Sequence, residues 1–267
     1  MCTVTITSDW TNYDYYLPKL IGEISCLQCD TKIINISNSV KPFNIPQACF
    51  ILKNTYKSFP LESIHLIAVN SEPTQEAGMV IVKYDGHWFV GINDGRFALL
   101  LDHIKLNVST LVYLLPSPTV FSTFMACGLF TRAIDLITQN IVEKELETTV
   151  LKLVGSDVPS IFEDKIIGHV VYIDSYGNAI TNISKEHFAK GYITWRSNHE
   201  NDPDFVIFVR GPYLKIYTIH NNYTDVQNGC TVALFNSAGL LELAINSGNF
   251  AQIENIDTTA EIMIKFS

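Results

Sequence analysis

The chain has 267 residues, a length that fits one or two domains. Hydrophobic residues make up 47% of it and charged residues only 17%, against about 25% charged residues in an average soluble domain. This composition excludes disorder as the main state, because there is enough apolar surface to offset the entropy lost on ordering. The net charge of -9, without any run of Lys and Arg, argues against nucleic-acid binding and against binding to anionic membranes. Low charge with many apolar side chains suggests that some surface is buried in an oligomer.

The start of the chain and its cysteines indicate a cytoplasmic protein. Residues 2–7 alternate in the manner of a strand and show neither the basic nor the apolar region of a signal peptide. The longest apolar runs fall far short of the roughly 20 residues that a membrane span needs. Cys26 and Cys29 have CxxC spacing, but no second CxxC or CxxH lies nearby to complete a zinc site. We therefore expect no membrane span and no metal site.

In the N-terminal half, strand and helix patterns alternate along the chain. We expect strands over residues 4–6, 32–36, 64–69, 79–84, 87–91, 97–101 and 110–114, and helices over residues 14–25, 46–55 and 124–142. Asp85 and Gly86 separate two of these strands, and this pair accepts the positive φ angles of a tight hairpin turn. Strands interleaved with helices predict a three-layer α/β domain with a mostly parallel sheet over residues 1–152.

The pattern changes after this half. Residues 153–165 have no clear period and are expected to form a linker. Strand patterns then dominate, over residues 165–174, 179–183, 205–209, 214–219, 231–235 and 240–244. Short strands separated by turn residues are typical of an all-β barrel or sandwich, which we expect over residues 166–267.

Three segments concentrate polar side chains that could bind a ligand. Asp9 follows the first strand, at the sheet edge where α/β proteins bind ligands, and its carboxylate could accept hydrogen bonds from a vicinal diol such as a ribose. From its position alone, a cap for the helix that follows is the favoured alternative. Residues 174–183 place a carboxylate, an aromatic ring and amides within one turn, and Asn236 and Ser237 lie in another turn. Both turns can also be explained as ordinary hairpins.

These segments occur together with further motifs spread over nearly the whole chain. The motifs are Ser8-Asp9, Asp14-Tyr15-Tyr16, Val40-Lys41-Pro42-Phe43, Phe59-Pro60, residues 86–91, Asp94-Gly95, residues 174–183 and residues 236–244. In this order they resemble the S-adenosyl-L-methionine (SAM) hydroxide adenosyltransferase family, which is related to the fluorinase and chlorinase enzymes. The segment 174–183 is the most specific part of the resemblance.

The resemblance implies an N-terminal α/β domain joined to a C-terminal β-barrel, assembled as a homotrimer. It places SAM between the N-terminal domain of one subunit and the C-terminal domain of its neighbour. The family transfers the 5′-adenosyl group of SAM to a small nucleophile, and with water the products are adenosine and methionine. No cofactor is implied beyond SAM itself, which is the substrate or ligand.

The resemblance also assigns roles to individual positions. Asp9 would hold the ribose hydroxyls, Phe43 would pack near the ribose and the nucleophile, and Asp174 would accept hydrogen bonds from the methionine ammonium. The other pocket positions are Tyr176, Asn178 at the adenine edge, Tyr223 at the adenine wall and Ser237 at the methionine carboxylate.

This chain departs from the polar trio of Asp, Arg and His that the water-using members of the family carry. The Asp position is Asn70, no Arg occurs in residues 75–78, and an ungapped match puts Phe121 at the His. An Asn can orient a water molecule but cannot take its proton at neutral pH. We therefore expect Asn70 and Ser122 to be the catalytic residues, acting as water-positioning groups.

Two nearby carboxylates, Glu72 and Glu76, could supply a displaced base, although the sequence does not define their geometry. The halide-using relatives also lack the trio, so a nucleophile other than water stays open. The main hypothesis is an enzyme that transfers the adenosyl group of SAM to water by in-line displacement at C5′. The alternatives are a trimeric SAM or adenosine sensor with little turnover, and a structural trimer with a decayed pocket.

Overall fold

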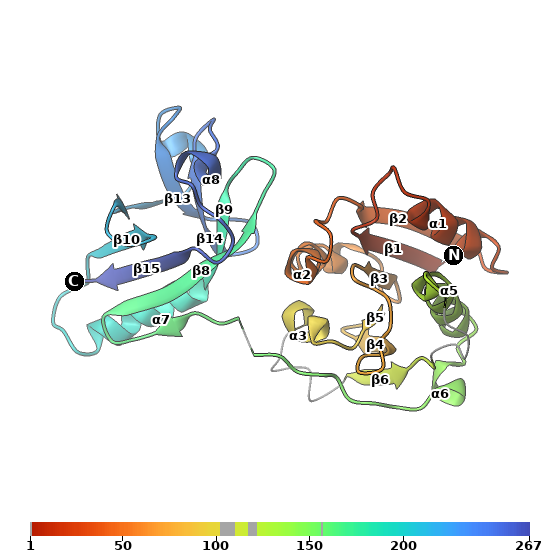
Figure 1. Ribbon diagram of the computed structural model, residues 1–267. Helices are drawn as coiled ribbons and strands as arrows, with labels where there is room; N and C mark the ends of the chain where they lie inside the picture. Colours follow the sequence, from red (N-terminus) through yellow and green to blue (C-terminus); the bar gives the residue numbers. More distant parts are fainter. Residues whose placement is uncertain (1, 102–109, 117–121, 156) are drawn as a thin grey trace. The chain divides into compact units, whose positions relative to one another are not determined.

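The computed structural model describes residues 2–101, 110–116, 122–155 and 157–267. The chain forms two compact units, Met1–Ser156 and Asp157–Ser267 (Figure 1). The first is a sheet with helices and the second consists mainly of strands, which confirms the expected fold class. Among the described residues, no helix has both the length and the apolar character that crossing a bilayer requires.

The N-terminal unit is built on a six-stranded sheet with the order β2-β1-β3-β5-β4-β6. Its strands are β1 (Cys2–Ser8), β2 (Thr31–Ser37), β3 (Ile64–Ala68), β4 (Met79–Tyr84), β5 (His87–Ile92) and β6 (Leu111–Leu114). β1 pairs in parallel with β2 and β3, β3 pairs in parallel with β5, and β4 runs antiparallel to β5 and β6. The sheet is therefore mostly parallel. Every residue of β3 and β5 is buried, as expected for strands covered on both faces.

Helices cover both faces of this sheet (Figure 1). α1 (Tyr16–Ser25) and α5 (Met125–Thr138) bury one face in a core that includes Val4, Ile6 and Phe130. α2 (Ile45–Lys53) and α3 (Arg96–Leu100) pack against the other face in a core that includes Phe89 and Phe97. A helical turn at Tyr56–Ser58 and the short α6 (Val142–Glu145) complete the unit. The three layers bring the carboxyl ends of β1 and β3 to one edge of the sheet.

Two sequence-based expectations for this unit are wrong in detail. Residues 97–101 were expected to form a strand, but they belong to α3, which begins after Gly95 in a left-handed conformation (φ 105°). A short apolar run does not distinguish a strand from a buried helical turn by its period. The helix expected over residues 124–142 ends at Thr138, because Asn140 adopts a left-handed conformation (φ 57°) that stops it.

The expected hairpin between β4 and β5 is confirmed. Asp85 and Gly86 both have positive φ angles, 50° and 75°, as a type I′ turn requires. A side chain at Gly86 would also place its Cβ only 2.8 Å from the Leu61 side chain.

The C-terminal unit is a nearly closed barrel with the strand order β11-β10-β15-β8-β9-β14-β13-β12, and β7 pairs with β8. The strands are β7 (Ser160–Ile161), β8 (Lys165–Ile173), β9 (Ala179–Ser184), β10 (Phe205–Val209), β11 (Leu214–Ile216), β12 (Ile219–His220), β13 (Thr231–Phe235), β14 (Leu240–Ile245) and β15 (Glu261–Phe266). β11 at one end of this order contacts β13 near the other end, so the sheet almost closes on itself.

The sequence analysis missed the helices of this unit, α7 (Lys185–Arg196) and α8 (Phe250–Ile253). α7 begins with a capping box, in which the Ser184 hydroxyl accepts a hydrogen bond from the His187 amide at 3.1 Å. Phe188, Tyr192 and Trp195 then follow at helical spacing and pack against the barrel core. The cap and this spacing were present in the sequence and predict the helix.

Candidate functional site

Asp9 lies at the carboxyl end of β1 and joins three segments of the N-terminal unit. Its Oδ2 atom accepts hydrogen bonds from the backbone amides of Phe43, at 2.9 Å, and Asn70, at 3.4 Å. Neither bond uses Oδ1, and no residue in the described part of the chain donates a hydrogen bond to it, so this oxygen can accept one. The first residue before α1 is Tyr15, without a side-chain cap, so Asp9 does not cap that helix. The structure therefore brings Asp9, Phe43 and Asn70 together.

Phe43 and Asn70 present these amides from unusual backbone conformations. Their φ angles are 63° and 44°, in the left-handed region that costs most non-glycine residues about 1–2 kcal/mol and asparagine less. Such conformations persist only where the surrounding structure imposes them. The Phe43 ring is 72% exposed, and the Asn70 side chain is exposed next to Asp9. Two loops are thus held in strained conformations around one carboxylate.

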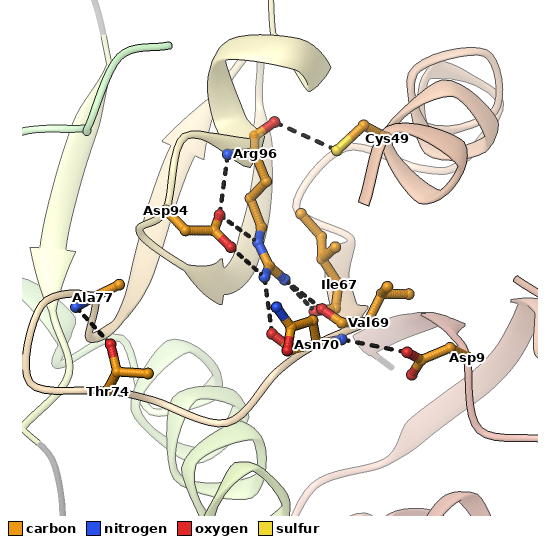
Figure 2. Close-up of polar contacts among 9 residues, drawn as sticks. All are labelled: Asp9, Cys49, Ile67, Val69, Asn70, Thr74, Ala77, Asp94 and Arg96. Atoms are coloured by element: carbon orange, nitrogen blue, oxygen red, sulfur yellow. Dashed lines mark hydrogen bonds and ion pairs between the residues drawn. The ribbon is translucent and has the colours of Figure 1, made fainter. Parts of the chain in front are cut away.

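Arg96, which the sequence analysis did not select, anchors the carboxyl end of β3 (Figure 2). Its guanidinium donates twice to Asp94, at 2.9 and 2.8 Å, in a bidentate ion pair. It also donates to three backbone carbonyls, those of Ile67 at 3.2 Å, Val69 at 2.9 Å and Asn70 at 3.0 Å. Arg96 is only 1% exposed. The one signal in the sequence was a charged residue between an Asp-Gly turn and an apolar run.

The ion pair also affects the acidity of Asp94. Burial by itself would raise the pKa of this carboxyl, but the hydrogen bonds and charge of Arg96 outweigh burial and hold the pKa below its usual value. Asp94 is therefore ionised at neutral pH, and the pair carries no net charge.

Glu72, considered above as a displaced base, caps α5. Its two oxygens accept hydrogen bonds from the backbone amides of Met125, at 3.0 Å, and Ala126, at 3.4 Å. Burial raises the pKa of Glu72, while these two hydrogen bonds act in the opposite direction. A carboxylate at a helix N-terminus is stabilised by the orphan amides there. Glu76, on the same loop, is exposed.

The second expected catalytic residue is Ser122. Ser122 is exposed and lies shortly before α5. Among the residues that the structure describes, no hydrogen bond joins it to Asn70. Phe121, the position matched to the family histidine, lies outside the described residues.

In the C-terminal unit, Asp174 organises the turn between β8 and β9. Its Oδ1 atom accepts from the backbone amides of Tyr176 and Asn178, each at 2.9 Å, and its Oδ2 atom accepts from the Asn178 side-chain amide at 3.0 Å. Gly177 has a φ of 84°, and a Cβ there would lie 2.1 Å from Asn249 Oδ1. Asn178 is buried, whereas Tyr176 is 76% exposed. The three expected residues of this segment therefore lie in one hydrogen-bonded turn.

A buried carboxylate that the sequence analysis missed, Glu242 on β14, holds Tyr223. Glu242 is 3% exposed and accepts hydrogen bonds from the Tyr223 hydroxyl and, at 3.0 Å, from the Asn236 side chain. Burial raises the pKa of Tyr223, and the hydrogen bond to Glu242 and the charges of Glu242 and Asp174 raise it further. Ser237 is exposed and follows Asn236 directly.

A surface hollow of about 410 Å³ lies elsewhere in the C-terminal unit. It is lined by Val158, Ser160, Ile167, Gly168, His169, Asn182, Thr259 and Glu261. None of the expected binding residues is among these. Within the described parts of the chain, no cluster of three or more His, Cys, Asp or Glu side chains could hold a metal ion.

Comparison with known proteins gives two matching family models. The model of the SAM hydroxide adenosyltransferase N-terminal domain matches residues 4–145, and that of the C-terminal domain of the same family matches residues 168–263. The (R)-S-adenosyl-L-methionine hydrolase of Methanocaldococcus jannaschii is 25% identical over 275 residues, which cover 98% of this chain and 95% of that protein.

Two solved structures share the fold over the whole chain. An uncharacterized conserved protein from Thermotoga maritima superposes with a TM-score of 0.81 at 20% identity, over 99% of this chain and 100% of that one. A conserved hypothetical protein from Thermus thermophilus gives a TM-score of 0.73 at 19% identity, over 100% of both chains. At these identities the likeness concerns the fold alone.

Proposed function

Since this chain belongs to the SAM hydroxide adenosyltransferase family, we propose that it binds SAM and transfers its 5′-adenosyl group to water. The observation that carries the proposal is the Asp9 carboxylate, whose Oδ2 is held by two backbone amides while Oδ1 is left for the ribose diol. The similarity to a SAM hydrolase over nearly the full length of both chains supports the same reaction.

The proposed reaction is an in-line displacement at C5′ of SAM. The water oxygen forms a bond to C5′ as the bond from C5′ to sulfur breaks, and the electron pair of that bond stays on sulfur. The products are methionine and adenosine, and the attacking water releases one proton. Because the sulfonium is already a good leaving group, the site must mainly align the reactants and exclude other water.

In the N-terminal unit, Asp9 would bind the ribose and the exposed Phe43 ring would cover it. Asn70 and Ser122 would orient the attacking water. Neither side chain takes a proton at neutral pH, and both oxygens of Glu72 accept hydrogen bonds from α5. General-base assistance is typically worth about 10²–10⁴-fold, so we expect slow turnover.

In the C-terminal unit, Asp174 and Asn178 would bind the two ends of SAM. Oδ2 of Asp174 accepts one hydrogen bond from Asn178 and keeps capacity for the methionine ammonium. The oxygen of the buried Asn178 amide would accept from the adenine amino group. Tyr176 and Tyr223 would supply the adenine walls, and Ser237 the contact to the methionine carboxylate.

We further propose that the two half-sites meet between subunits of a homotrimer, with the N-terminal unit of one chain facing the C-terminal unit of the next. The large exposed area of the Phe43 and Tyr176 rings supports this. The polar groups of the residues next to these rings already have hydrogen-bond partners, and within the described part of the chain apolar side chains do not cover the rings, so a neighbouring subunit could cover them. No cofactor beyond SAM is required.

A SAM or adenosine sensor with little turnover is the second candidate. The use of Glu72 as a helix cap favours it, because this carboxylate is engaged away from the water. Incubating the purified protein with SAM and measuring adenosine and methionine by chromatography separates the two. Product above the uncatalysed rate supports the enzyme. Calorimetric SAM binding without product supports the sensor, and the absence of both refutes the proposed function.

A further inference from the structure

The carboxyl end of β3 needs hydrogen-bond donors that the sheet does not supply. The pairing of β3 with β5 ends at Leu66 and Val90, so the carbonyls that follow lack that neighbour. Arg96 supplies the donors, and its contacts with Asp94 and the three carbonyls use all five of its N–H groups. Burying a guanidinium is costly unless it is paired and fully hydrogen-bonded, and here it is both.

The chain turns sharply at the last of these carbonyls. Both backbone groups of Asn70 are hydrogen-bonded (Figure 2). Its carbonyl accepts a hydrogen bond from Arg96 Nη2 at 3.0 Å, and its amide donates one to Asp9 Oδ2 at 3.4 Å. Its φ of 44° is the conformation that lets one residue make both contacts. Hydrogen bonds therefore link Arg96 to Asp9 through one intervening residue, Asn70.

We propose that Arg96, oriented by Asp94, is a positioning residue for the nucleoside half of the site. It imposes the left-handed conformation of Asn70, and Asn70, together with the Phe43 amide, in turn fixes Asp9 Oδ2 so that Oδ1 faces the ribose. This inference rests on the proposed function for the identity of the ligand. Its structural step, from Arg96 through Asn70 to Asp9, concerns this chain alone.

Replacing Arg96 by lysine tests this role. It keeps the positive charge, but its ammonium has three donors and cannot form the planar fork that matches a carboxylate and adjacent carbonyls. In Arg96→Lys the Asn70 conformation is no longer imposed. Small misplacements in a binding site have large effects, and we expect SAM to bind on the order of tenfold more weakly.

A second substitution separates positioning from a general loss of structure. Glycine adopts positive φ angles without the cost that asparagine carries, so Asn70→Gly should reduce the need for Arg96. The experiment is a double-mutant cycle of Arg96→Lys and Asn70→Gly, with the SAM dissociation constant measured by calorimetry on variants shown to be folded by circular dichroism. Arg96→Lys should cost about tenfold with Asn70 present and less than about threefold with glycine at position 70. Equal losses in both backgrounds would overturn the inference.

The matched control is Arg196→Lys, which alters an exposed arginine that pairs with Asp202 at 3.3 Å. Its affinity should equal that of the unaltered protein. If Arg96→Lys does not fold, Asp94→Asn replaces it in the cycle, because it keeps the arginine and weakens the ion pair that orients it. Asp94→Asn should lose less SAM affinity than Arg96→Lys. If this loss is smaller when position 70 is glycine, the result supports the proposal, and equal losses with asparagine and with glycine at position 70 contradict it.

Hydrogen exchange of the residue 70 amide distinguishes failure of this inference from failure of the proposed function. Arg96→Lys should speed its exchange, with a smaller change when position 70 is glycine. If the unaltered protein binds no SAM, the proposed function fails, while this exchange pattern still supports the positioning role. Unchanged exchange in Arg96→Lys would refute the positioning role whether or not SAM binds.

Discussion

Two aspartates use part of their hydrogen-bonding capacity on their own surroundings. Asp9 accepts from two backbone amides, and Asp174 accepts from two backbone amides and one side-chain amide. Hydrogen bonds to a charged acceptor are the stronger kind, so each carboxylate stabilises a loop in addition to the ligand contact that we propose for it. Variants at these positions must separate the two roles.

Asp174 allows that separation. Asp174→Asn can still accept both backbone amides with its side-chain oxygen, but its NH₂ group would face the Asn178 amide and a ligand ammonium, which are also donors. We expect it to keep its melting temperature within a few degrees and to lose more than about 1 kcal/mol of SAM binding. Asp174→Ala should lose both binding and stability. Unchanged calorimetric affinity in Asp174→Asn would contradict the assignment of the ammonium contact.

A buried histidine pair makes the stability of the N-terminal unit sensitive to acid. His65 contacts the Thr5 hydroxyl at 2.7 Å and His87 at 3.2 Å. Burial lowers the pKa of His65 to about 3, and the charge of His87 acts in the same direction. Burial also lowers the pKa of His87, although Asp85 and Glu62 oppose this. Both imidazoles are therefore held neutral in the folded protein.

Because unfolded histidine has a pKa of about 6.5, the unfolded chain takes up protons first as the pH falls. The stability due to neutral His65 is complete above about pH 6.5 and is lost as the pH falls towards about 3, at up to about 1.4 kcal/mol per pH unit. Urea unfolding at pH 7, 6 and 5 should show this decline, and it should be shallower in His65→Gln. Parallel curves for the two proteins would rule out His65 as the source.

Among the elements, α5 depends on a residue far from it in sequence. Its N-terminus has no side-chain cap from the adjacent residue Phe124, and Glu72 supplies the acceptors from the loop after β3. The helix in turn packs on the same core as β1. The loop that carries Asn70 and Glu72 is therefore attached at both ends, to Asp9 and to α5.

Glu72→Ala should lower the free energy of unfolding by about 1 kcal/mol, because it removes a carboxylate from a helix N-terminus. For a chain of this size the melting temperature should fall by about 2–4 °C. Glu76→Ala, on the exposed part of the same loop, is the control and should leave it unchanged. If Glu72 were instead the catalytic base, Glu72→Gln would abolish adenosine release with little loss of stability, and this result would overturn the helix-cap interpretation.

At the largest scale, we propose that the site is shared by two chains. Its halves lie in two compact units, Met1–Ser156 and Asp157–Ser267, and each half is completed by hydrogen bonds within its own unit. A site shared between subunits can be tested by complementation, because one defective half can be replaced by an intact half from a neighbour.

Co-expression of Asp9→Asn with Asp174→Asn should restore SAM binding to about a quarter of the sites in a random mixed trimer. Each variant alone should bind weakly. Asp9→Asn with Arg96→Lys, both altered in the N-terminal unit, is the control and should restore nothing. Light scattering gives the mass of the assembly. A monomeric protein, or mixed trimers without recovered binding, would contradict the shared site.

Much of the fold followed from local patterns in the sequence. The alternation of strands and helices, the Asp85-Gly86 hairpin and the position of Asp9 after β1 depend on neighbouring residues, and the structure agrees with each. α7 could also have been found from its capping box. α3 could not, because five residues with an apolar pattern suit a strand or a helix equally until their packing is known.

Local sequence patterns are thus sufficient for the two-part architecture and for the residues at the turns, where short-range chemistry decides the conformation. The folded molecule was needed to show that Arg96 binds carbonyls 26–29 positions away in the chain, that Tyr223 is held by Glu242, and that Glu72 caps α5. A buried polar group must find a partner, but nothing local specifies which one. That choice is made by the packing that brings distant backbone and side-chain atoms within hydrogen-bonding distance.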